Sequence, residues 1–173
     1  MARRTFFSFH YDNDVWRANQ VRMSNVVLGT DRAGYFDHSE YEDAKRAGAL
    51  GIQRMILRHL ENTTVTVVLI GRDTATRPWV QYEIAESIKR KNGLLGIYIH
   101  HLRDPNQLST ISILGQMMPP LKPAVPPLVE FPAYSWDPQN VSGFAQLIEA
   151  AGQRADRMRK PLPPPGLGFL RSR

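Results

Sequence analysis

The stretch Thr64-Val65-Thr66-Val67-Val68-Leu69-Ile70-Gly71 decides the fold of this chain. Its β-branched and aliphatic residues form one continuous run, which is typical of a strand buried on both faces of a parallel sheet. Gly71 ends the run. The stretch therefore predicts a central strand over residues 64–70, with helices covering both faces of its sheet.

Shorter apolar runs and helical patterns alternate on both sides of this strand. The sequence predicts further strands over residues 5–9, 25–28, 94–99 and 131–135. It predicts helices over residues 15–23, 39–60, 78–91 and 138–159, the second with a capping box that begins at Ser39. This order is typical of an α/β, flavodoxin-like doubly wound sheet of about five mainly parallel strands flanked by helices, in which the first and third strands are neighbours.

Composition and charge exclude several classes of protein. The chain has 173 residues, 42% hydrophobic and 22% charged, which is typical of one globular domain. The absence of cysteine excludes thiolate catalysis and cysteine-based metal sites. The net charge of +6 is concentrated at the two ends, because residues 154–173 carry +5 and Arg3 and Arg4 add +2. A basic tail without a recognition motif does not indicate nucleic-acid binding, so we do not expect it.

The chain is expected to form one domain over residues 1–160, with a Pro-rich connection over residues 101–130. A flexible, Pro-rich and basic tail is expected over residues 161–173. No apolar stretch reaches the roughly 18–20 residues that a membrane span needs, and no signal-peptide region follows the first methionine. We therefore expect a cytoplasmic protein that does not bind membranes.

Several common activities lack their motifs. The phosphate-binding loop of NTPases and the Gly-rich turn of dinucleotide-binding dehydrogenases are both absent. A receiver-like phosphotransfer site would need an aspartate at the end of the central strand, where Ile70 and Gly71 stand. The five histidines show no metal-ligand spacing, so no metal site is expected.

The fold class points to two loops and one helix. In such a sheet, ligands bind where the chain reverses direction, at the carboxyl ends of the first and third strands. Those ends are followed by residues 10–14 and 72–78, and the next helix carries Trp79 and Glu83. These two side chains are four residues apart, so an aromatic ring and a carboxylate lie together on one helix face. Either residue alone is usually structural, and their joint position favours a site.

Two stretches resemble a known family. Phe6-Phe7-Ser8-Phe9-His10 is similar to the first box of the Toll/interleukin-1 receptor (TIR) superfamily, and Trp79-Val80-Gln81-Tyr82-Glu83-Ile84 is similar to the W-x-x-x-E motif of NAD-cleaving TIR domains. Stretches that resemble the branch containing the TIR subunit of the Thoeris anti-phage defence system are residues 16–17, 21–22, 71–74, 93–100 and 134–137. The resemblance covers about residues 3–155. The Arg-Asp-x-x-Pro-Gly second box of receptor TIRs is missing, which argues against adaptor-style signalling.

The resemblance implies an enzyme that cleaves NAD⁺ to nicotinamide and a cyclic ADP-ribose-type signal for a separate effector protein. It also implies a phage-derived trigger and self-association. Glu83 is the implied catalytic residue. NAD⁺ is the substrate, and no permanently bound cofactor is expected. The nicotinamide leaves as a neutral group, and an ionised Glu83 would stabilise the oxocarbenium-like ribose, hold the ribose hydroxyls or capture the anomeric carbon covalently. The residues expected to bind substrate are Ser8, Phe9, His10, Tyr11, Asp12, Asn13, Arg77 and Trp79.

Two other classes of function stay open. In a non-enzymatic TIR-like interaction module, Glu83 would be surface charge. In a nucleoside deoxyribosyltransferase-like enzyme, a glutamate on a flavodoxin-like sheet transfers a different N-glycosyl group. Arg77 has two interpretations, contact with a pyrophosphate or surface pairing with Glu83 or Asp73. Arg17 and Arg22 are expected to serve assembly rather than substrate binding.

Overall fold

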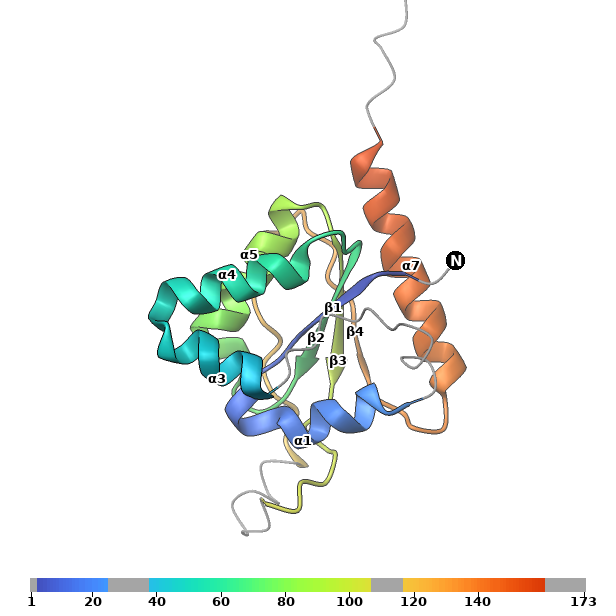
Figure 1. Ribbon diagram of the computed structural model, residues 1–173. Helices are drawn as coiled ribbons and strands as arrows, with labels where there is room; N and C mark the ends of the chain where they lie inside the picture. Colours follow the sequence, from blue (N-terminus) through green and yellow to red (C-terminus); the bar gives the residue numbers. More distant parts are fainter. Residues whose placement is uncertain (1–2, 25–37, 107–116, 161–173) are drawn as a thin grey trace, which may run out of the picture.

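The computed structural model describes residues 3–24, 38–106 and 117–160. Figure 1 labels the helices and strands of the fold. The strands are β1 (Thr5–Ser8), β2 (Val65–Ile70), β3 (Gly93–Tyr98) and β4 (Ala133–Ser135). The helices are α1 (Tyr11–Arg22), α3 (His38–Arg46), α4 (Gly48–Leu60), α5 (Pro78–Lys89), α7 (Val141–Arg159) and the short 3₁₀ helix η1 (Thr74–Thr76).

The sheet confirms the predicted α/β class. Its strands are ordered β1-β2-β3-β4 and every pairing is parallel. All six residues of β2 are buried, as its continuous apolar run predicts. β1 lies directly beside β2, which confirms that the first and third predicted strands are neighbours. The predicted strand over residues 25–28 lies outside the described residues.

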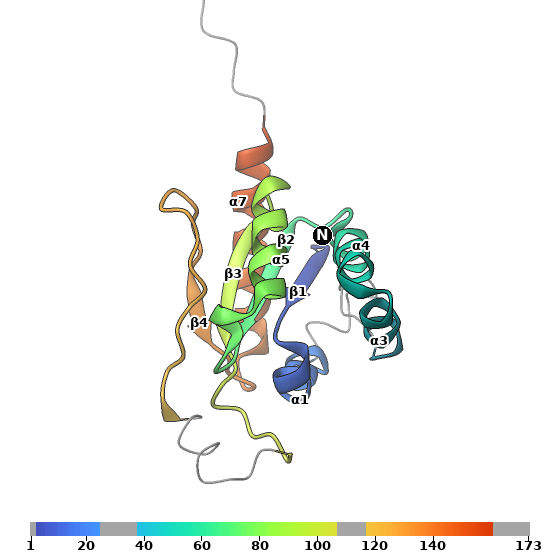
Figure 2. The same cartoon turned by 90° about the vertical axis from the view of Figure 1, so that its left-hand side faces the viewer.

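Helices cover both faces of the sheet. Side chains of α1 and α7 pack on the face that contains Phe7, Val67 and Leu95. Side chains of α4 and α5 pack on the opposite face, against Phe6 and Val68 respectively. Figure 2 shows α5 in front of the sheet and α7 behind it. The fold is therefore doubly wound, and the loops at the carboxyl ends of the strands are held between two helical layers.

The predicted helix over residues 39–60 is wrong as a single element. The chain forms α3 and α4, which are separated at Ala47, and α4 begins at Gly48, where the φ angle is +75°. Ser39 does not cap a helix, because α3 already begins at His38. Glu42, the glutamate of the predicted box, lies 4.0 Å from Lys45 of the same helix, and the neighbouring Glu40 contacts His59 of α4 at 2.8 Å.

The other helix ends differ from the predicted ones by a few residues. α1 begins at Tyr11 rather than near residue 15, and α7 begins at Val141, where the side chain of Asn140 accepts a hydrogen bond from the Gly143 amide. Within the described parts of the chain, no helix combines the length and apolar character that crossing a bilayer requires. The expected tail lies outside the described residues, and the domain boundary at residue 160 stays a prediction.

Candidate active site

Helix α5 carries Glu83 to the carboxyl end of β1. The helix starts with Pro78 in its first turn, where a missing amide hydrogen does no harm. Val80 and Ile84 are 2% and 3% exposed and anchor the helix on the sheet. This packing buries Glu83 to 4% exposure and brings it to Ser8, the last residue of β1, which is fully buried. The Ser8 Oγ and the Glu83 Oε2 form a hydrogen bond of 2.5 Å.

The electrostatic state of Glu83 follows from its burial. Burial raises the pKa of Glu83 to about 8, and the hydrogen bond from Ser8 opposes part of that rise. In the free protein the carboxyl is therefore mostly protonated at pH 7. The sequence-based expectation of an ionised Glu83 needs a further cause, such as a nearby positive charge on a ligand.

A pocket of about 310 Å³ opens in front of Glu83. Predicted site residues that line it are Phe9, His10, Tyr11, Asp12, Arg77, Trp79 and Glu83. Ser8 reaches the pocket only through its hydrogen bond to Glu83. Asn13 is not part of the lining, and its carbonyl lies 3.4 Å from a guanidinium nitrogen of Arg17 within α1. The fold thus brings together seven of the nine predicted residues and places one more directly behind them.

His10, which follows β1, and Arg77, in the segment between β2 and α5, are predicted site residues that line the pocket. His10 is partly buried, and this burial, together with the charge of Arg77, lowers the pKa of His10 below its ordinary value. Its ring is therefore neutral at pH 7. Arg77 precedes α5, and its guanidinium lies 3.9 Å from the Asp73 carboxylate. Of the two surface partners considered for Arg77, the structure therefore shows Asp73 and not Glu83. That contact is long and partly exposed, so it stabilises little.

Trp79 has both structural and site-lining contacts. Its ring packs edge to face on Tyr82, with centroids 6.0 Å apart, and lies against the core cluster of Phe6, Ile52 and Ile56. The same ring borders the pocket. Phe9, 8% exposed, packs with the opposite core cluster while also bordering the pocket.

Sequence reasoning missed one whole wall of the pocket. This wall comes from α3 and α4 and consists of Tyr41, Lys45, Ile52, Met55 and Ile56. The Tyr41 ring stacks on the Tyr11 ring with centroids 4.2 Å apart, and the Tyr11 hydroxyl forms a hydrogen bond of 3.0 Å with the His38 ring. The available signal was the i, i+4 pair of Tyr41 and Lys45, which the capping-box interpretation left unused.

A buried ion pair supports the loop below the pocket. Arg17 is 4% exposed and donates to the Asp14 carboxylate and to the Leu102 carbonyl, each at 2.9 Å. The expectation that Arg17 serves assembly is therefore wrong, because its side chain is enclosed. The expectation for Arg22, which is exposed, stays a prediction. Among the described residues, no group of three or more histidine, aspartate or glutamate side chains could hold a metal ion.

Two comparisons with known proteins bear on this site. The family model described as "Thoeris protein ThsB, TIR-like domain" matches residues 6–104, which include all nine predicted site residues. A protein of Bacillus cereus (strain MSX-D12), named "Putative cyclic ADP-D-ribose synthase ThsB1", is 46% identical over 106 residues. That match covers 60% of this chain and 55% of the relative, so the chain spans little more than half of the relative's length. Both matches confirm the resemblance that the two motifs predicted.

Proposed function

The chain belongs to the Thoeris ThsB family of TIR-like domains, and from this premise we propose that it is an NAD⁺-cleaving enzyme of anti-phage defence. Its products would be nicotinamide and a cyclic ADP-ribose-type signal that activates a separate effector protein. The observation that carries the proposal is the buried Glu83 carboxyl at the head of the pocket, held by Ser8 from the first-box motif. A buried carboxyl with a raised pKa in a pocket is a common mark of a catalytic group.

The proposed chemistry requires little from the protein. The nicotinamide of NAD⁺ is a cationic pyridinium, so it departs as a neutral molecule without a protonating acid. As the glycosidic bond breaks, the ribose becomes oxocarbenium-like, and the ionised Glu83 carboxylate stabilises that positive charge. The pyridinium charge beside Glu83 lowers the pKa of the carboxyl, so substrate binding itself produces the ionised form.

The pocket lining suggests a role for each group that contacts the substrate. The stacked rings of Tyr11 and Tyr41 offer a platform for a base, and Trp79 offers a second aromatic surface. Arg77 and Lys45 lie on two sides of the pocket and are suited to the pyrophosphate.

Three further polar side chains complete these assignments. The neutral His10 and the exposed Asp12 are suited to ribose hydroxyls, because both offer hydrogen-bond acceptors beside Glu83. Asn13 is outside the lining, and we propose that its backbone carbonyl, 3.4 Å from the Arg17 guanidinium, helps to position the start of α1 instead.

The product depends on which nucleophile reaches the anomeric carbon. Water would give ADP-ribose, whereas an atom of the same ADP-ribose, folded back, would give a cyclic isomer. Aromatic and aliphatic walls favour the second outcome, because they exclude water and hold both ends of the molecule in one pocket. The diffusible product would link this protein to its effector, and a phage-derived trigger and self-association belong to the same proposal.

The test is incubation of NAD⁺ with purified protein, with and without lysate of phage-infected cells, followed by chromatography and mass spectrometry. We expect nicotinamide and a cyclic ADP-ribose mass from the wild type, and loss of both in Glu83→Gln. Glu86→Gln is the matched control, because Glu86 lies three residues further along α5 and pairs with Lys89 outside the pocket lining. Its activity should equal that of the wild type.

Each other outcome selects a different function. Intact NAD⁺ under every condition, with folded protein, would favour the interaction module. Cleavage of deoxynucleosides but not of NAD⁺ would favour the deoxyribosyltransferase-like reaction. Equal NAD⁺ turnover by the wild type and Glu83→Gln would remove the catalytic role from Glu83.

A further inference from the structure

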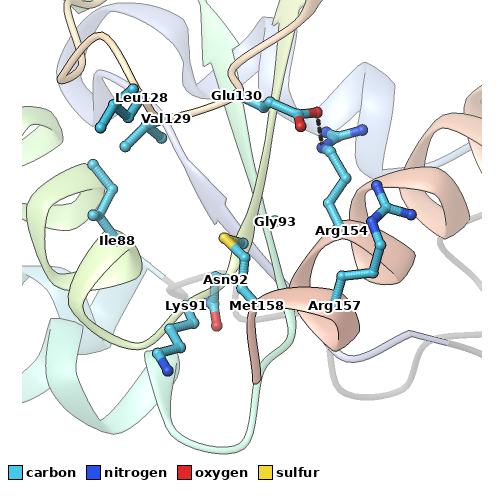
Figure 3. Close-up of a pocket in the computed structure, with 10 residues that line it drawn as sticks. All are labelled: Ile88, Lys91, Asn92, Gly93, Leu128, Val129, Glu130, Arg154, Arg157 and Met158. Atoms are coloured by element: carbon cyan, nitrogen blue, oxygen red, sulfur yellow. Dashed lines mark ion pairs between the residues drawn. The ribbon is translucent and has the colours of Figure 1, made fainter. Parts of the chain in front are cut away.

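A second pocket lies at the opposite end of the sheet, where the strands begin. It has a volume of about 300 Å³ and lies between the end of α5, the turn before β3, the segment of residues 128–130 and the end of α7. Figure 3 shows this pocket. It shares no lining residue with the pocket of Glu83, so it is a separate feature of the surface.

One part of this second pocket is apolar and the other is cationic. Ile88, Leu128 and Val129 lie together on one side, as Figure 3 shows, with Met158 near the centre. The side chains of Arg154 and Arg157 lie on the other side.

The acidic charge of the lining does not balance its cations. In the part of the chain that the structure describes, the lining contains three cationic residues, since Lys91 joins the two arginines, and one acidic residue, Glu130. Glu130 lies 3.6 Å from the Arg154 guanidinium, and 75% of its side chain is exposed. The lining therefore has a net positive charge that an acidic ligand would complement.

The exposure of the apolar side chains indicates the size of the ligand. Leu128 is 99% exposed and Met158 is 47% exposed, although both border the pocket. A small molecule seated in the pocket would leave the protruding Leu128 in water, whereas a polypeptide lying across the pocket would cover it. Among the described residues, the lining includes no aromatic ring on which a nucleotide base could stack. The observations therefore favour a protein segment over a nucleotide.

We propose that this second pocket docks an acidic segment of a partner protein. The segment places one apolar side chain between Ile88, Val129 and Met158, and its carboxylates meet the exposed cations of the lining, Arg157 and Lys91. A pocket of about 300 Å³ is large enough for one leucine or phenylalanine side chain. Such a central apolar anchor with charged neighbours is the usual arrangement of a strong contact in a protein interface. The proposal does not depend on NAD⁺ cleavage.

The test measures fluorescence anisotropy of short labelled peptides on the full chain. The probe has one central leucine flanked by aspartates and glutamates. One control peptide replaces the leucine by serine, and another replaces the carboxylates by amides. We expect saturable binding of the probe, and binding that is about tenfold weaker or more for each control peptide.

Protein variants locate the binding. Arg157→Glu reverses a charge in the lining, and Met158→Glu removes the central apolar contact. Each should weaken the probe by about tenfold or more. Lys160→Glu is the matched control, because it makes the same change of charge just beyond α7 and outside the lining, and it should weaken the probe by less than about twofold. Thermal unfolding midpoints check that the variants fold.

Several results would overturn the proposal. One is equal weakening by Lys160→Glu and Arg157→Glu, which would indicate attraction to a general basic surface. A second is equal binding of the leucine and serine peptides, which would remove the apolar anchor. A third is displacement of the peptide by a single-stranded oligonucleotide that binds more tightly. The absence of saturable binding by the probe would also overturn it.

Discussion

At neutral pH the Glu83 carboxyl of the free protein keeps its proton, because burial raises its pKa to about 8. If the ionised form is required, kcat/KM for NAD⁺ rises with pH and levels off above about 8, since kcat/KM reports ionisation in the free enzyme. The kcat profile should level off at lower pH, because the cationic substrate lowers the pKa of Glu83 in the complex. Profiles of kcat and kcat/KM from pH 6 to 9 measure both.

Ser8→Ala tests the hydrogen bond that opposes the burial effect. Loss of the Ser8 hydroxyl removes the interaction that lowers the pKa of Glu83, so the rise in kcat/KM moves to higher pH. Ser142→Ala, at an exposed position of α7, is the control and leaves the profile in place. A shift to lower pH in Ser8→Ala would contradict this account of the site.

The same pKa makes stability depend on pH. A carboxyl whose pKa is raised from 4.5 to about 8 by folding binds its proton more tightly in the folded state. The free energy of unfolding therefore falls as pH rises between these values, by about 1.4 kcal/mol per pH unit at most. Glu83→Gln removes this dependence, so its advantage in unfolding midpoint over the wild type should grow between pH 6 and pH 8. An advantage that stays constant would contradict the raised pKa.

Lys45 and its neighbour Arg46 allow a matched test of the pocket wall that α3 and α4 form. Lys45 borders the pocket, whereas Arg46 points to solvent and pairs with Asp43. Lys45→Ala should raise KM for NAD⁺ by about three- to tenfold, because it removes one cation from a partly exposed phosphate contact. Arg46→Ala should leave KM unchanged. Steady-state kinetics of the two variants decide the point, and equal KM values would remove Lys45 from the site.

At the scale of elements, the sequence predicts those helices and strands that depend on local patterns, and it misses contacts between segments far apart in the chain. The apolar run of β2 and the helical spacing of α5 are local patterns, so the central strand and the position of Glu83 could be predicted. The wall of Tyr41 and Lys45 could not, because it forms only when α3 packs beside α1. The division between α3 and α4 was also missed, since a glycine in a helical pattern does not reveal a positive φ angle.

Gly48 makes that division possible. At a φ angle of +75° a side chain is strained, and a Cβ atom at Gly48 would meet no other atom within 4 Å. Gly48→Ala should therefore destabilise the protein by about 1–2 kcal/mol through the backbone alone. Urea unfolding measures the change. Ala49→Gly at the next, exposed position is the control for helix propensity, and should cost about 1 kcal/mol or less. A Gly48→Ala variant as stable as the wild type would contradict the left-handed geometry.

At the scale of the whole molecule, the two pockets lie at opposite ends of the parallel sheet. The pocket of Glu83 lies at the carboxyl ends of the strands, and the proposed docking pocket lies at their amino ends. Helix α5 borders both pockets, with Trp79 and Glu83 in one and Ile88 in the other. Buried hydroxyls fix this helix on the sheet, because Thr66 donates to Ser87, which donates to the Glu83 carbonyl, each at 2.7 Å.

The carboxyl end depends on a buried charge cluster that joins three loops, in which Arg17 pairs with Asp14 at 2.9 Å and with Asp104 at 3.9 Å. Asp14 and Arg17 belong to α1, and Arg17 also holds the Leu102 carbonyl after β3. The Asp14 carboxylate occupies the space where a side chain at Gly71, directly after β2, would lie. Burial raises the pKa of Asp14 to about 6 in spite of Arg17, so the pair is enclosed and its members depend on each other.

Removing one member should therefore disturb both stability and the site. Arg17→Met leaves Asp14 and Asp104 buried without their cation and should lower the free energy of unfolding by about 3–5 kcal/mol. Asp14→Asn combined with Arg17→Met should cost less than the sum of the two single changes, because the second change removes a group that the first left unpaired. Unfolding in urea gives these values.

The KM for NAD⁺ shows whether Arg17 supports the pocket loop at the start of α1 or only contributes to the stability of the protein. Because Arg17 holds the start of α1, where His10, Tyr11 and Asp12 line the pocket, KM for NAD⁺ should rise in Arg17→Met at a temperature where the variant is fully folded. Ile148→Val, which trims a partly buried side chain on α7, lowers stability without touching this loop and should leave KM unchanged. Equal KM values in Arg17→Met and Ile148→Val would confine the ion pair to a structural role.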